Sequence, residues 1–267
     1  MPAIQPRAST RVSIQWQDDP PIEETETLVL TFPTHYLDLR VYLAGHPQHG
    51  HIQWAQAGDV KLIHAADAAD DDNHAAAANL PSLEFIPRIN SVPPPPSHIP
   101  KLADQASFET LPNGDVQEFG SMFNPDRMRN ESYIEVWRRM GLRSLHDDDD
   151  GGGGGGHVPA LRVEQQSFSS SQDATAVHAF IGHIGQFALG IARIEAPERD
   201  RFIAWREAYD FESRGWRRVV SVGQDEELVR YVPSIARFLS RADASRQGTG
   251  LSLDGEGEEW TVLYASE

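Results

Sequence analysis

The sequence predicts an all-β protein with enough strands to fill two successive antiparallel barrels. Apolar residues recur with a period of two much more often than with the helical period of 3.6. Roughly a dozen short runs of this kind are separated by turn residues such as glycine, proline and asparagine. Long amphipathic segments, which would indicate helices, are missing between them. Short alternating strands with frequent turns are typical of barrels and sandwiches.

The clearest strand lies at 36–43, where the alternation is complete. Its apolar face carries Leu37, Leu39, Val41 and Leu43, and its other face carries Tyr36, Asp38, Arg40 and Tyr42. Such a pattern predicts a strand with one face buried. Similar runs predict further strands at 12–16, 28–31, 52–57, 116–123, 161–167, 175–181 and 187–194.

The sequence pattern of the C-terminal part predicts a hairpin, a short helix and a last strand. Runs at 202–211 and 216–222 flank a turn that ends in Gly215, as in a β-hairpin. The stretch 233–241 fits a short helix, with Ile235, Phe238 and Leu239 on one side. The run 261–264 is expected to supply a closing strand.

Four low-complexity stretches divide the chain, and three of them are expected to be disordered inserts. Residues 64–79 are rich in alanine and aspartate, and 146–157 contain six consecutive glycines, which lose much backbone entropy on folding. Residues 242–259 form a Gly/Ser/acidic loop, and 93–96 form a polyproline spacer. We therefore expect an N-terminal barrel half over 1–98 and a C-terminal half over 99–267.

Composition excludes several functional classes. The chain has no cysteine, which removes disulfides, thiolate catalysis, Cys-ligated zinc and iron–sulfur clusters. The N-terminus lacks the apolar region of a signal peptide, and no apolar run is long enough to span a membrane. These features favour a cytoplasmic, possibly also nuclear, protein. A net charge of −17 argues against a nucleic-acid partner.

Two sets of motifs follow each other in a fixed order along the chain. The first set comprises a strand that ends at Trp16, the run Thr27-Leu28-Val29-Leu30-Thr31, the run Tyr36-Leu37-Asp38-Leu39-Arg40 and the run from Ile52 to Gly58. The second is Glu118-Phe119-Gly120-Ser121-Met122-Phe123-Asn124-Pro125 followed by Tyr133-Ile134-Glu135-Val136-Trp137-Arg138. In this order the motifs resemble those of a fungal family, the casein-kinase-interacting Hri-one proteins. The likeness covers 11–58 and 108–140, and more loosely 187–234. This chain departs from the family pattern at Ile134, at Asp126-Arg127 and in its long inserts.

The resemblance implies a fold and a partner. The fold would be two lipocalin-like barrel halves, and the partner a casein-kinase-type protein, with no established catalysis. Ser170 and Ser240 each have an acidic residue three positions on, the spacing that casein kinases prefer. Whether either serine is phosphorylated is left open by the sequence.

The strongest candidate for a ligand site is the polar face Tyr36, Asp38 and Arg40. In a small barrel one face of each strand points inward, where an arginine beside an acid and aromatic rings would hold a polar ligand group. The alternative is an outward ion pair of little energetic weight. Trp54 and Trp137 are expected to be core or cavity wall, and Glu118 is a candidate acid. His46, His49 and His51 lie close together in a glycine- and proline-containing turn without a nearby carboxylate, so we predict no metal site and no cofactor.

Three functions remain open at this point. The first is a non-enzymatic interaction protein that uses its barrels as a scaffold for a protein partner. The second is a carrier of a small apolar or heme-like ligand in a barrel cavity. The third is an isomerase or cyclase on the same barrel, with acids such as Glu118 or Asp38. An enclosed pocket of several hundred Å³ with convergent polar groups would favour the carrier, whereas a barrel filled by its own side chains would exclude it.

Overall fold

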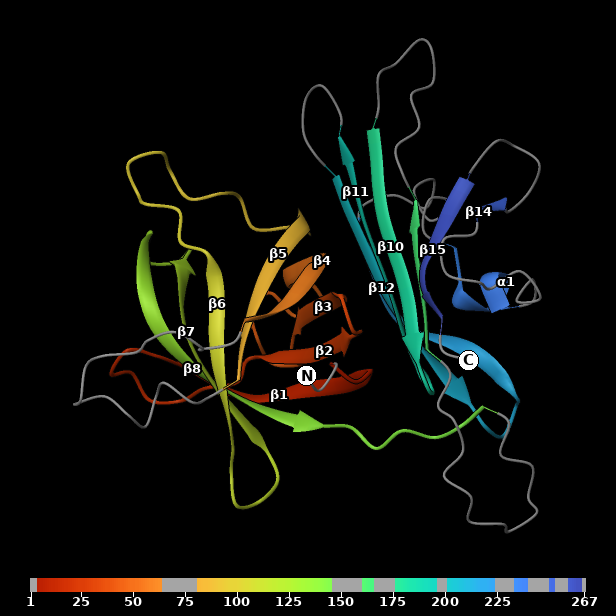
Figure 1. The fold of residues 1–267 in the computed structure, drawn as a ribbon, viewed down its shortest axis with the longest axis horizontal. Helices are drawn as coiled ribbons and strands as arrows, with labels where there is room; N and C mark the ends of the chain where they lie inside the picture. The colour runs from red at the N-terminus through yellow and green to blue at the C-terminus, as the bar shows by residue number, and fades with distance from the viewer. Residues whose placement is uncertain are drawn as a thin grey trace.

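The computed structural model describes residues 4–63, 81–145, 160–165, 176–195, 201–223, 233–239, 250–252 and 259–265. Within these ranges the chain forms strands β1 to β15 and one short helix. The strands make two antiparallel sheets that lie side by side (Figure 1). The predicted all-β fold with two successive antiparallel halves is thereby confirmed.

The first eight strands close into a barrel in which each strand pairs with the next and β8 returns to β1. Closure pairs every strand on both sides and leaves no free edge. The strands are β1 (Arg7–Trp16), β2 (Thr25–Thr31), β3 (His35–Tyr42), β4 (Ile52–Ile63), β5 (Ser82–Asn90), β6 (Asp104–Thr110), β7 (Val116–Asn124) and β8 (Arg129–Arg139).

The remaining strands form a seven-stranded sheet in the order β13-β12-β11-β10-β9-β15-β14. Its pairing confirms the predicted hairpin, now β12 and β13, and the helix predicted near 235 is α1. The elements are β9 (Ala160–Gln165), β10 (Ala176–Ile184), β11 (Phe187–Glu195), β12 (Arg201–Asp210), β13 (Gly215–Gly223), α1 (Ile235–Leu239), β14 (Gly250–Ser252) and β15 (Glu259–Ala265).

Strand β3 is buried on both faces. Its apolar face points out of the barrel, although an apolar face usually points into one. Leu37 and Leu39 are fully buried, but they point out of the barrel and pack in a cluster with Ile184, Leu189 and Ile191 of the second sheet. The polar face of β3 instead points into the barrel. The second sheet thus covers the apolar outer face of β3, and the polar face of β3 lies in the barrel interior.

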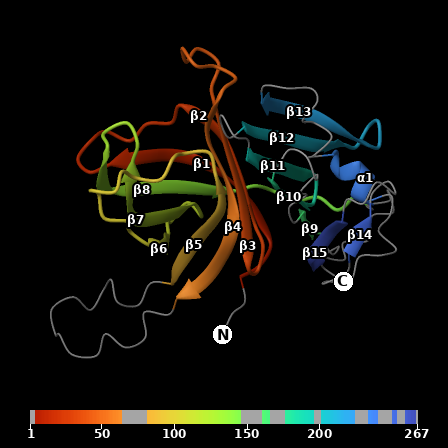
Figure 2. The ribbon, with the colours of Figure 1, turned by 90° about the horizontal axis from the view of Figure 1, so that it is seen from above.

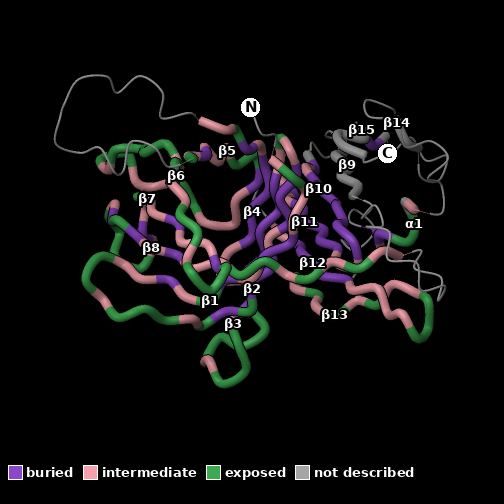
Figure 3. The backbone as a smooth tube through the Cα atoms, turned by 60° about the horizontal axis from the view of Figure 1, so that its bottom comes forward, coloured by how far each residue is buried: buried purple, intermediate pink, exposed green. Residues whose placement is uncertain are grey.

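The apolar layer between the two sheets is the largest core of the protein among the described residues. Figure 2 shows β3 and β4 facing the second sheet, and Figure 3 shows buried backbone gathered in β4, β10, β11 and β12. Side chains from both sheets interdigitate there, among them Ala8, Leu28, Leu30, Phe32, Leu37, Leu39, Ala55, Ala57, Ile89, Phe180, Ile184, Leu189, Ile191 and Ala204. The sheets therefore form one packed unit.

Polar contacts of Arg206 reinforce this layer at its rim. Arg206 of β12 donates through Nη1 to Glu26 Oε1 at 2.5 Å and through Nη2 to the Glu26 carbonyl at 3.1 Å. The arginine side chain is almost fully covered, whereas the glutamate is largely exposed. These contacts link β2 of the barrel to the second sheet.

The two halves divide at a different place from the predicted one. The barrel extends to Arg139, so β6, β7 and β8 belong to the first sheet and not to a half that begins at 99. The proline run at 93–96 lies in the connection between β5 and β6. Proline is common in ordinary barrel loops as well as in spacers between domains, which is why the run misled the prediction.

The structure differs from the prediction in two other places. The insert predicted over 242–259 contains β14, which pairs with β15, so that part of the prediction is wrong. Strand β5 escaped prediction because it contains Pro87, which lies beside the irregular register at Ala57 and Gly58. Residues 64–79 and 146–157, together with Ser170 and Ser240, lie outside the described residues.

Candidate functional site

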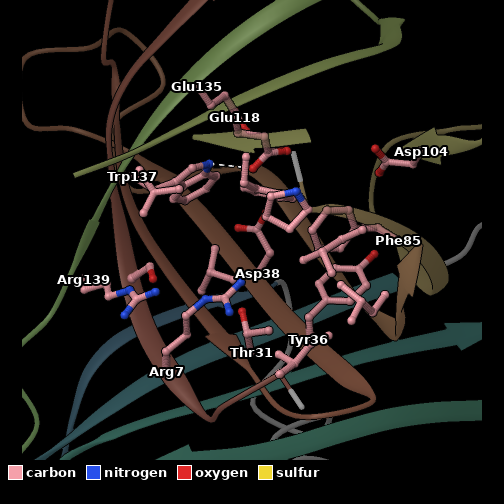
Figure 4. A pocket seen from close by; sticks show the side chains of 18 of the residues that line it. Arg7, Thr31, Tyr36, Asp38, Phe85, Asp104, Glu118, Glu135, Trp137 and Arg139 are labelled. Atoms are coloured by element: carbon pink, nitrogen blue, oxygen red, sulfur yellow. Dashed lines mark hydrogen bonds between the residues drawn. The ribbon is translucent and has the colours of Figure 1, made fainter. Parts of the chain in front are cut away.

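A cavity of about 500 Å³ lies inside the barrel (Figure 4). Inward-facing side chains from all eight barrel strands line it. This volume lies within the range of natural small-molecule sites, and eight strands leave room for one small ligand when side chains do not fill the interior. The cavity reaches the barrel end where β1 begins and β8 ends, and the exposed residues Thr110 and Arg139 mark this end as its mouth.

The inner part of the cavity is a dense network of charged groups. Arg40 donates through Nη2 to Asp38 Oδ2 at 2.8 Å and through Nη1 to Glu135 Oε1 at 2.9 Å. Arg11 donates to the same Glu135 oxygen at 2.6 Å and also binds Glu23. Burial lowers the pKa of Arg40, but Asp38 and Glu135 outweigh it and hold the pKa above its usual value. Arg40 is thus fixed as a cation.

Two tryptophan rings flank this network. The Arg40 guanidinium carbon lies 5.3 Å from the centre of the Trp54 ring and 5.7 Å from that of Trp137. Both distances lie within the range of cation–π attraction. Arg40 is therefore held by two carboxylates and by two aromatic rings, and it has little freedom to reorient.

Glu118 occupies a different setting on β7, between two neutral donors. Its Oε1 accepts a hydrogen bond from the Tyr133 hydroxyl at 2.8 Å, and its Oε2 accepts one from Trp137 Nε1 at 2.7 Å. Burial, reinforced by the nearby charge of Glu135, raises the pKa of Glu118 to about 8. At neutral pH the Glu118 carboxyl group therefore carries its proton.

Glu118 makes the stability of the protein depend on pH. Its pKa is higher in the folded than in the unfolded chain, so the folded state binds the extra proton between about pH 4.5 and 8. The free energy of unfolding should therefore fall as pH rises through this window. Glu118→Gln mimics the protonated form, because its Oε1 accepts from Trp137 and its amide donates to the Tyr133 oxygen. Relative to the wild type, we expect the free energy of unfolding of this variant to gain about 3–4 kcal/mol between pH 5 and pH 8.

Urea denaturation at both pH values measures this difference. Glu109→Gln, at an exposed position on β6, is the matched control and should leave the pH profile of the wild type unchanged. Parallel profiles for Glu118→Gln and the wild type would show that Glu118 is ionised in the folded protein.

Asp104 is the second carboxyl group with a shifted pKa. It lies at the start of β6, opposite Phe85 of β5, and Figure 4 shows it across the cavity from Arg7 and Arg139. Burial, together with the charge of Glu135, raises its pKa to about 6. In the described part of the chain its side chain has no hydrogen-bond or ion-pair partner. Asp104 therefore offers a free carboxylate to the cavity at neutral pH.

One wall of the cavity is apolar. Leu83 and Phe85 of β5 and Phe108 of β6 line it, and Phe85 packs edge-on against Tyr36 with ring centres 5.1 Å apart. Val29 of β2 and Val116 of β7 add apolar surface elsewhere in the cavity lining. The cavity thus combines apolar surface with a few fixed polar groups, as small-molecule sites do.

Two arginines stand at the mouth. Arg7 begins β1 and Arg139 ends the neighbouring strand β8, and both line the cavity. Burial and the like charge of Arg139 lower the pKa of Arg7. The two guanidinium groups are therefore close enough to repel each other.

Comparison with known proteins places the chain in a family. The family model described as Protein HRI1 matches residues 7–263, which is nearly the whole chain. The chain belongs to the HRI1 family. No curated protein matches it by sequence. Among solved structures, it is similar to the crystal structure of the uncharacterized protein YLR301w from Saccharomyces cerevisiae, with a TM-score of 0.64 and 16% identity over 98% of this chain and 99% of that chain. At this identity, the likeness shows a shared fold.

In this HRI1-family chain, the barrel brings together the residues singled out from the sequence. Tyr36, Asp38, Arg40, Glu118 and Trp137 all line the cavity, and Trp54 lies behind Arg40. Asp38 and Arg40 do pair with each other, but inside the barrel and not on its outer surface.

Sequence reasoning missed four residues that shape the same cavity of the HRI1-family barrel: Arg7, Asp104, Glu135 and Arg139. Glu135 and Arg139 alternate with Tyr133 and Trp137 along β8, so a period-two pattern could have placed them on one face with Trp137. Asp104 and Arg7 sit at strand ends, where the pattern gives no signal.

The histidine cluster contributes no site in the described residues. No group of three or more potential metal ligands occurs there. The His46 ring stacks on Tyr42, with ring centres 4.1 Å apart, and His49 contacts the Tyr42 carbonyl oxygen. Within the described ranges, no helix of this HRI1-family chain has the length and apolar character needed to cross a membrane.

Proposed function

We propose that this HRI1-family protein binds a small amphipathic organic molecule in the barrel cavity without converting it chemically. The observation that carries the proposal is the cavity of about 500 Å³, in which an apolar wall faces a fixed set of polar groups. A barrel that served only as a scaffold would gain stability by filling this space with its own side chains. The charged network at the inner end supports the same proposal, because it holds the polar groups in place before a ligand arrives.

A neutral apolar fluorophore, N-phenyl-1-naphthylamine, tests the proposal. We expect its fluorescence to rise on binding to the wild type. Val29→Trp directs a large ring into the cavity and should weaken binding about tenfold or more. The matched control is Val12→Trp, at an exposed position on the neighbouring strand, which should bind within about twofold of the wild type.

Val116→Trp on β7 is a second variant that fills the cavity, and it provides an independent test if Val29→Trp does not fold. Circular dichroism verifies the fold of each variant. Binding that survives both cavity variants would contradict the proposal. So would a wild type that does not bind the fluorophore at all.

An isomerase or cyclase is the second candidate function, and one observation favours it. Glu118 and Asp104 line the same cavity with pKa values of about 8 and about 6, so one is protonated and the other ionised at neutral pH. Enzymes separate acid and base roles in this way. Asp38 is unsuited to such a role because Arg40 holds it. Mass analysis of the ligand that co-purifies with the protein separates the two functions, because an enzyme returns a mixture of substrate and product.

The interaction with a casein-kinase-type protein, implied by the resemblance, stays a prediction, as does the cytoplasmic location. The proposed ligand site and a protein partner are compatible. The cavity lies inside the barrel, and the outer faces of β6, β7 and β8 lie away from the second sheet (Figure 2).

A further inference from the structure

We propose that Arg7 and Arg139 form a subsite for an anionic group of the ligand, so that the barrel selects organic anions with an apolar body. This inference rests on the proposed function, since it names the class of ligand that the cavity takes. The anionic group would be a carboxylate or a phosphate, held at the mouth, and the apolar body would lie deeper, against Phe85 and Phe108.

The first argument is the contrast between these two arginines and their neighbours. In the described part of the chain, neither Arg7 nor Arg139 has a carboxylate partner within ion-pair distance. Arg11 and Arg40, deeper in the same barrel, each bind two carboxylates, and Arg138 next to Arg139 binds Asp115. The protein thus pairs its interior arginines and leaves two at the mouth available.

The second argument is their position relative to each other. Ser9 of β1 pairs with Arg139 of β8. Arg7 lies two residues before Ser9, on the same inward-facing side of β1. Both side chains line the cavity, and Figure 4 shows both on the side of the cavity opposite Asp104. Two like charges held together in a partly covered site repel each other, and an anion between them removes the repulsion. Guanidinium groups suit this role, because their planar fork matches carboxylate and phosphate oxygens.

The third argument fixes the direction of the ligand. Asp104 and Glu135 lie away from the mouth arginines, and their negative charges would repel a second anionic group. Arg40 offers no alternative anion site, because Asp38 and Glu135 already occupy its donors. An anion is therefore best accommodated at the mouth.

Displacement of N-phenyl-1-naphthylamine by decanoate and by 1-decanol tests the inference, because the two competitors differ in charge and share their chain. In the wild type we expect decanoate to displace the fluorophore at about tenfold lower concentration than 1-decanol. Arg7→Gln combined with Arg139→Gln should abolish this preference, measured in the variant itself as the ratio of the concentrations at which the two competitors displace the fluorophore. Decyl phosphate, tested in parallel, should share the preference and its loss.

Arg138→Gln is the matched control, because Arg138 neighbours Arg139 but binds Asp115 and does not line the cavity. It should keep the preference for decanoate. Equal displacement by decanoate and 1-decanol in the wild type would overturn the anion subsite while the cavity remained a binding site. A fluorophore that does not bind to the wild type would overturn the proposed function itself.

Discussion

Glu135→Gln is expected to lower the free energy of unfolding by about 3 kcal/mol. The Glu135 carboxylate is buried and accepts hydrogen bonds from both Arg11, at 2.6 Å, and Arg40, at 2.9 Å. Without the negative charge of Glu135, the buried positive charges of Arg11 and Arg40 each have one carboxylate partner instead of two. The loss should lie at the lower end of the range for a broken buried pair, because Arg11 keeps Glu23 and Arg40 keeps Asp38.

Urea denaturation at pH 7 measures the effect of Glu135→Gln. Glu109→Gln removes a charge from an exposed position and should change stability by less than about 0.5 kcal/mol. A second readout is specific to the network. The charge of Glu135 helps to raise the pKa of Glu118, so the variant should lower that pKa, which carboxyl-detected NMR reports. Equal stability of the two variants, with an unchanged pKa of Glu118, would show that Glu135 does not organise the interior.

Leu39→Ala is expected to lower the free energy of unfolding by about 2–5 kcal/mol. Leu39 is fully buried on the outer face of β3, in the apolar layer that joins the barrel to the second sheet. Truncation would open a cavity between two rigid sheets, which have little freedom to close it. Because one layer serves both sheets, we expect the variant to unfold in a single cooperative transition at lower denaturant concentration.

Leu43→Ala provides the comparison for this prediction. Leu43 continues the same alternating face of the sequence, yet it lies just beyond β3 and is 39% exposed. Its truncation should cost less than about 1 kcal/mol. Similar losses for the two variants in thermal or urea denaturation would contradict the packing of the barrel face against the second sheet.

The strands of this protein were predictable where apolar and polar residues alternate along the sequence. The run Tyr36 to Leu43 shows this best, because alternation depends on local geometry alone. The direction of its two faces was not predictable in the same way. The apolar face of a lone strand is expected to point into the barrel, but here a second sheet, far along the chain, covers it from outside. Only the tertiary structure decides between these arrangements.

The candidate site was predictable to the extent that its residues share a strand. Tyr36, Asp38 and Arg40 lie at alternate positions of β3, so one inward residue implies the others. Glu135 and Asp104 come from strands more than sixty residues away along the chain, and their nearness to Arg40 depends on closure of the barrel. The shifted pKa values of Glu118 and Asp104 follow from burial and from Glu135, neither of which local sequence encodes.

Methyl NMR of the protein titrated with N-phenyl-1-naphthylamine tests the ligand site in the barrel most directly. Val29, Leu83 and Val116 carry methyl groups that line the cavity, whereas Leu37 and Leu39 lie in the layer outside the barrel. We predict that the first three residues shift with a common saturating dependence on ligand concentration, and that Leu37 and Leu39 stay within the noise. Shifts confined to exposed residues such as Ile22 and Val219, with unchanged signals from the cavity, would contradict a ligand site inside the barrel.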